Sequence, residues 1–123
     1  MAIEARTTLV AELASAREAR RFVLDTLQAW NCEHVADAVI LLTSELVTNA
    51  ILHAGTDIGI VVLGSDNTVR VEIDDHSPRL SAPHERGPGQ LSGLRLTLVD
   101  VMSGSWGVED GATGKTVWFE VPA

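Results

Sequence analysis

The stretch from Leu41 to Thr56, LLTSELVTNAILHAGT, sets polar side chains at helical spacing into an otherwise apolar segment. Glu45, Asn49 and His53 follow one another at intervals of four residues, so an α-helix places them on one stripe. The neighbouring stripe is apolar, which predicts a helix buried against a core. Asn is a poor residue for a helix interior, because its side chain competes for backbone hydrogen bonds, so mid-helix it usually has a tertiary role.

Three interpretations fit this polar stripe. A Glu and an Asn one turn apart suit phosphoryl chemistry, because the amide oxygen can ligate a hard cation such as Mg²⁺ while the carboxylate takes a proton. The second interpretation is structural, a buried amphipathic helix whose Glu45 and Asn49 are merely solvated at its edge. The third takes Glu45, Asn49 and His53 as a metal-binding stripe, but the sequence offers no second His or Cys cluster to support it.

Size and charge exclude several classes of function. With 123 residues, of which 46% are hydrophobic, the sequence predicts one domain, 1–123, with a proper core. The formal net charge of −8 argues against nucleic acid as a direct partner, because phosphate binding needs a basic surface. Cys32 is alone, so an internal disulfide is impossible. The start MAIEART has no apolar leader, and apolar runs fall short of the ~20 residues that span a bilayer, so we expect a cytoplasmic protein without a membrane segment.

Hydrophobic periodicity predicts the order of the elements. Residues 1–8 are short and polar, which fits an edge strand or a loose arm. The segment 74–92 loses all periodicity and collects prolines and glycines, which indicates a mobile loop. The other predicted elements are, in chain order, a helix over 9–30, a helix over 34–53, strands over 58–63 and 68–73, a helix over 93–103, and strands over 106–108 and 115–121. This order predicts an α+β fold, a two-layer sandwich of a mainly antiparallel sheet with helices on one face.

The run SELVTNAILHAG resembles the N-box of the GHKL ATPase superfamily, and its residues are most similar to those of the small bacterial anti-sigma-factor serine kinases. The order of helices and hairpins matches that domain from end to end. The resemblance therefore implies the GHKL, or Bergerat-type, ATP-binding fold. It further implies Glu45 as the general base, Asn49 as the ligand of Mg²⁺, and the loop before the third helix as an ATP lid.

Three further motifs carry the resemblance, with departures. Asp75 stands where the family has the Asp that accepts from the adenine amino group, but the run DHSPR replaces both following glycines, Ser77 among the replacements. Gly93 opens the second glycine box, in which Arg95 stands where a glycine belongs. A guanidinium there could clamp a phosphate or fill the space that phosphate needs. In the closing strand, Thr116 matches the Thr that supports the adenine-binding Asp through water.

The resemblance implies an ATP-binding regulator with ATP and Mg²⁺ as cofactors. Such a protein serine/threonine kinase transfers the γ-phosphoryl group of ATP to a serine of an anti-anti-sigma (STAS-type) partner, and it sequesters a sigma factor. The alternative is a nucleotide-independent protein-binding module of the same fold, which Arg95 and the missing glycines favour. Glu45, Asn49, Asp75 and Thr116 favour the enzyme. A DNA-facing regulator is disfavoured by the charge, and a homodimer is left open.

Overall fold

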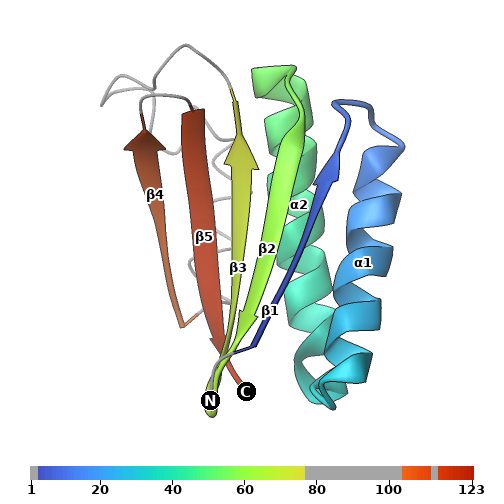
Figure 1. Ribbon diagram of the computed structural model, residues 1–123, viewed down its shortest axis with the longest axis vertical. Coiled ribbons are helices and arrows are strands. Elements are labelled where there is room, and N and C mark those ends of the chain that lie inside the picture. The colour runs from blue at the N-terminus through green and yellow to red at the C-terminus, as the bar shows by residue number, and fades with distance from the viewer. Residues whose placement is uncertain (1–2, 77–103, 112–113) are drawn as a thin grey trace.

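The computed structural model describes residues 3–76, 104–111 and 114–123. In these ranges the protein has two layers, a five-stranded antiparallel sheet with helices on one face (Figure 1). The predicted α+β fold class is therefore confirmed. The elements run, in chain order, β1 (Ile3–Leu9), α1 (Ser15–Ala29), a 3₁₀ turn (Glu33–Val35), α2 (Ala36–Ala54), β2 (Ile58–Gly64), β3 (Thr68–Asp75), β4 (Ser105–Gly111) and β5 (Gly114–Pro122).

The N-terminal segment is a strand, and the helix after it begins later than the periodicity predicted. β1 pairs antiparallel with β2 at one edge of the sheet, so the edge strand is the correct alternative and the loose arm is wrong. α1 begins at Ser15 instead of Leu9, because Leu9 is buried as the last residue of β1, opposite Ile58. A few apolar positions cannot distinguish the end of a strand from the first turn of a helix.

α2 is the central helix of the second layer and follows the prediction closely. It ends at Ala54, and the φ of 68° at the next residue, Gly55, is the left-handed conformation expected just beyond a helix. The segment Glu33–His53 is long and apolar enough to cross a membrane, with a mean hydropathy of 1.6, and half of it is buried inside the protein. Val39, Leu42 and Val47 are fully buried in the core, which accounts for this apolar content.

The strand order is β1-β2-β3-β5-β4. β2 with β3 and β4 with β5 form the two predicted hairpins, although β3 continues beyond its predicted end to Asp75. β3 and β5 are neighbours despite the long stretch of chain between them, and their register sets Asp75 opposite Lys115 and Asp74 opposite Thr116. The rest of the predicted loop and the predicted third helix fall on 77–103, outside the described residues.

Alternate residues along β3 and β5 are buried, so the sheet has an inner face, which packs against the helices, and an open outer face. The core lies between the inner face and the helices. Its largest fully buried side chains are Phe119, Leu27, Leu42, Ile58, Ile60, Val23, Val39, Val47, Val62, Val69 and Val71. The predicted alternation of β5, with Val117, Phe119 and Val121 on one face, is confirmed.

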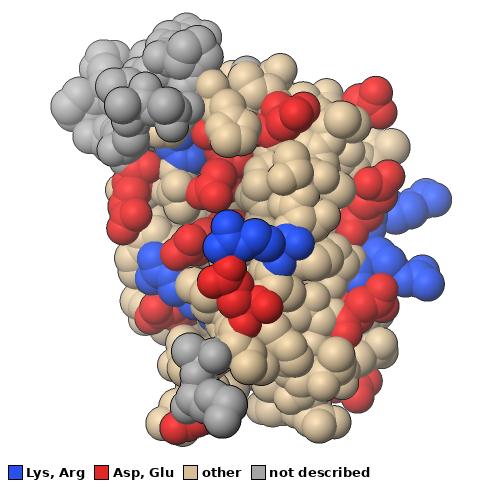
Figure 2. Space-filling model, in the orientation of Figure 1, with Lys and Arg blue, Asp and Glu red and all other residues tan. Residues whose placement is uncertain are grey.

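Arg70 organises the outer face. Its Nε donates a hydrogen bond to Glu72 at 2.8 Å and its Nη1 donates to Glu120 at 3.1 Å. Its guanidinium lies 4.1 Å from the centre of the Trp118 ring, a cation–π distance. Burial opposes the charge of Arg70, but the hydrogen bonds and attraction of the two carboxylates outweigh it and raise the pKa of the guanidinium. Figure 2 shows basic and acidic side chains interspersed over this face.

Candidate functional site

α2 carries the polar stripe that the sequence predicted. Glu45 is half-buried, Asn49 is only 3% exposed, and His53 is exposed. Glu45 and Asn49 both interact with other groups of the protein. A side chain as buried as Asn49 is not solvated at a helix edge, so this part of the structural interpretation is wrong for Asn49.

A metal-binding stripe on α2 finds no support in the described part of the chain. Within residues 3–76, 104–111 and 114–123, no three or more His, Cys, Asp or Glu side chains are grouped so that they could hold a metal ion. Asn49, one helical turn from Glu45, remains a suitable ligand for Mg²⁺, because this cation takes oxygen ligands and keeps several of its waters.

Asp75 ends β3 with its carboxylate on the inner face, where its side chain is 2% exposed. Lys115, directly opposite on β5, places its Nζ 3.9 Å from Asp75 Oδ2, and its side chain is 18% exposed. At this distance the contact is an ion pair and not a hydrogen bond. A carboxylate buried this deeply needs charged or hydrogen-bonding partners, and Lys115 is one of the partners of Asp75.

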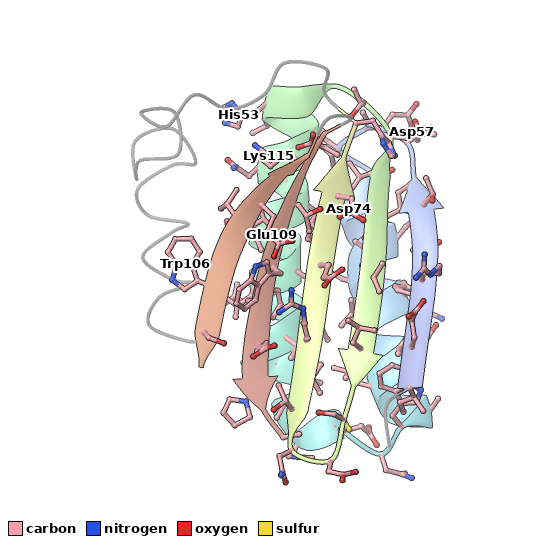
Figure 3. The ribbon with its side chains drawn as sticks, turned by 60° about the vertical axis from the view of Figure 1, so that its left-hand side comes forward. His53, Asp57, Asp74, Trp106, Glu109 and Lys115 are labelled. Atoms are coloured by element: carbon pink, nitrogen blue, oxygen red, sulfur yellow. The ribbon has the colours of Figure 1, made fainter. Side chains whose placement is uncertain are left out.

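Thr116 lies on the other side of the sheet. Its Oγ1 donates a hydrogen bond of 2.5 Å to Oδ1 of Asp74. Figure 3 labels Asp74 on β3. Consecutive residues of a strand point to opposite faces, so Thr116 cannot support Asp75 from this position. The predicted pairing of Thr116 with Asp75 is therefore wrong.

Lys115 is the residue of the closing strand that reaches Asp75, and motif matching missed it. A signal for it was present in the sequence. Val117 and Phe119 were predicted to share one face of β5, and counting back by two from Val117 places Lys115 on that same face.

Gly114 allows β5 to begin this close to the end of β3. Its φ is 156°, and a Cβ at this position would lie 2.0 Å from the backbone carbonyl oxygen of Asp75. Any other residue would push the two strands apart, because this contact is with rigid backbone. Gly114 thereby helps to hold the next residue, Lys115, opposite Asp75.

The end of β3, the start of β5 and the C-terminal end of α2 lie at the same end of the molecule (Figure 1). α2 contacts both of these strands, and Figure 3 shows Lys115 and His53 near this end. The candidate site in the described residues thus comprises Glu45 and Asn49 on the helix, and Asp75 and Lys115 on the sheet. We call these four residues the inner-face site.

Three predicted site residues, Ser77, Gly93 and Arg95, lie outside the described residues. Their roles stay predictions from the motifs.

A model of the histidine kinase-like ATPase domain matches residues 9–121, which contain the whole inner-face site. The chain belongs to this family. It is thus a GHKL-type ATP-binding domain, of a family whose members in general bind ATP with Mg²⁺. The described part of this histidine kinase-like ATPase also has the predicted antiparallel sheet with helices on one face.

Solved structures similar to this histidine kinase-like ATPase include the histidine kinase domain from Erythrobacter litoralis EL346 blue-light activated histidine kinase. The two are 24% identical, with a TM-score of 0.49, and the match covers 72% of this chain and 44% of that chain. No curated protein matches the chain.

The donor chemistry of the inner-face site fits a magnesium nucleotide. Asn49 offers an amide oxygen to a hard cation, and Glu45 lies one helical turn away as a proton acceptor. Asp75 offers a buried acceptor to a base that carries an amino group. Burial makes such a hydrogen bond electrostatically stronger than it would be in water.

Proposed function

We propose that this protein is a serine kinase of the GHKL type, an anti-sigma regulator that phosphorylates a STAS-type anti-anti-sigma partner. The observation that carries the proposal is the placement of buried Asn49, with Glu45 one turn before it, on the helix that packs against the strands of Asp75 and Lys115. The match of the N-box to the anti-sigma kinases supports the choice of partner. The net charge of −8 also supports a partner with a basic surface.

In the proposed reaction, ATP supplies the phosphoryl group and Mg²⁺ neutralises the charge on its phosphates. The serine oxygen forms a bond to the γ-phosphorus while the bond from this phosphorus to the bridging oxygen breaks, and ADP leaves. Glu45 accepts the proton of the serine hydroxyl on its carboxylate. Asn49 holds the cation through its amide oxygen, and Asp75 accepts a hydrogen bond from the amino group of the base.

The second candidate is a protein-binding module that does not use nucleotide. One observation favours it, since the acceptor proposed for the base amino group, Asp75, already has the ammonium of Lys115 beside it. Titration with Mg-ATP in a calorimeter separates the two candidates. We expect the kinase to bind with a Kd of about 10 to 100 μM, which is modest for a nucleotide site. An absence of heat would favour the module.

Glu45→Gln tests the chemistry. This change removes a charge at a half-buried helix position without opening a cavity, so the Tm should stay within a few degrees and the Mg-ATP affinity within several-fold. Phosphoryl transfer to the partner serine should fall by ~10² or more, because the base is lost. Glu18→Gln, the same change on the exposed side of α1, is the control and should keep its rate. If Glu45→Gln and Glu18→Gln transfer the phosphoryl group at equal rates, Glu45 is not the general base.

A further inference from the structure

We propose that Lys115 reads the base, and that Lys115 and Asp75 form a donor–acceptor pair specific for the Watson–Crick edge of a 6-aminopurine. This inference rests on the proposed nucleotide site and adds a specificity residue to it. Lys115 lies in the closing strand of the resemblance, which gives it no role of its own. Its position beside Asp75 comes from the pairing of β3 with β5.

The surroundings of the pair make its charges effective. The Asp75 side chain is 2% exposed and that of Lys115 is 18% exposed, so solvent screens their charges little. A buried ion pair often stabilises a fold no more than apolar residues of the same size would, so stability alone is a weak reason for this one. The pair places two charges of opposite sign side by side on the inner face.

The distance between the two groups leaves the N–H donors of Lys115 unused by Asp75. Nζ and Oδ2 are 3.9 Å apart, which exceeds the 2.7 to 3.2 Å of an N–H···O hydrogen bond. The contact between them therefore uses neither an N–H group of Lys115 nor a lone pair of Asp75. An ammonium group carries three donors, and a carboxylate accepts through two oxygens. A ligand can thus receive a hydrogen bond from Lys115 while it donates one to Asp75.

Adenine has the matching pattern. Its Watson–Crick edge carries the N6 amino group, a donor, directly beside N1, an acceptor. With Asp75 accepting from N6, Lys115 can donate to N1. Guanine and hypoxanthine reverse both functions, because they carry O6 as an acceptor and N1–H as a donor. In the same orientation they would set O6 against the carboxylate and N1–H against the ammonium, and unmatched buried polar groups are costly.

The test is a binding cycle that removes each partner of the Lys115–N1 hydrogen bond in turn. The ligands are Mg-ATP and its 1-deaza analogue, in which carbon replaces N1. The proteins are the wild type and Lys115→Met, which keeps the length of the side chain and removes the donor. We expect the analogue to bind the wild type about tenfold more weakly than ATP does. Lys115→Met should bind ATP about tenfold more weakly and distinguish the two ligands by less than about twofold.

Two further variants separate base reading from a structural role. Lys115→Gln keeps an N–H donor without the charge, so it should recover part of the preference for ATP over the 1-deaza analogue. Arg6→Met removes a basic side chain from the exposed β1 and should bind both ligands as the wild type does. The comparison of the two ligands on the wild-type protein needs no variant, so it remains decisive even where Lys115→Met fails to fold.

Each contrary result has a distinct meaning. Equal affinity of the wild type for ATP and the 1-deaza analogue overturns this inference and leaves the kinase proposal standing. If Lys115→Met binds ATP and the wild type does not, the inference is also overturned, since Lys115 would then block the base site. Binding by neither protein overturns the proposed nucleotide site, and this inference falls with it.

Discussion

On the outer face of the β3–β5 ladder, the two carboxylates that meet Arg70 are 26% and 35% exposed, whereas on the inner face the carboxylate of Asp75, which meets Lys115, is 2% exposed. All three ion pairs belong to the same pair of strands, and those of Arg70 lie closer to water than that of Asp75. Exposed pairs are screened and typically contribute ~0 to 1 kcal/mol to stability. A buried pair keeps its field, so it has more influence on what can bind beside it.

Asp74 and Asp75 show the same contrast within one dipeptide. Asp74 accepts a hydrogen bond from Thr116 on the outer face, and Asp75 faces Lys115 on the inner face. Their chemistry is identical, and their sequence neighbourhood is almost the same. The face to which each residue points decides which of them can contribute to a site against the helices.

The largest effect is expected in the core itself. Phe119 is fully buried on the inner face, so Phe119→Ala should lower the free energy of unfolding by ~3 to 5 kcal/mol through lost burial and a cavity. Its neighbour Trp118 is half-buried on the outer face over Gly107 and beside Arg70, so Trp118→Ala should cost only ~1 to 2 kcal/mol. Urea denaturation measures both values. Equal losses would mean that the two faces are equally buried.

A smaller effect is expected on the affinity of the site for Mg-ATP. Asp75→Asn removes the charge that we propose accepts from the base, so the affinity for Mg-ATP should fall about tenfold or more. The matched control is Asp74→Asn, which changes only the outer face and should keep the affinity within about twofold. Calorimetric titration of both variants gives the comparison. The assignment of the inner face to the nucleotide fails where Asp74→Asn has the greater effect.

Arg70→Lys should have the smallest effect. It keeps the positive charge and loses the two-pronged contact with Glu72 and Glu120, so the free energy of unfolding should fall by ~0.5 to 1 kcal/mol. Arg21→Lys, at an exposed pair with Asp25, is the control and should change nothing measurable. Added salt should shrink the difference between Arg70→Lys and the wild type, because the outer face is open to ions. A difference that does not depend on salt would contradict this description of the face.

The helix of the site could be predicted from the sequence, because the residue patterns that indicate it are local. Because Glu45, Asn49 and His53 follow one another at intervals of four residues, the sequence placed them on one stripe of α2. The end of the helix at Gly55 followed from the residue type alone. The predicted start of α1 at Leu9 was wrong, since pairing with β2, and not local periodicity, assigns that residue to a strand.

The order of the described elements, the fold class and the alternation of β5 could be predicted from the sequence, because each depends on a periodicity over a few neighbouring residues. Only the tertiary structure decided that Asp75 meets Lys115 and that Thr116 meets Asp74. A period of two assigns each residue to a face, but it does not set the register between strands far apart in the chain. That register comes from packing the whole sheet against its helices, with Gly114 allowing the last strand to approach.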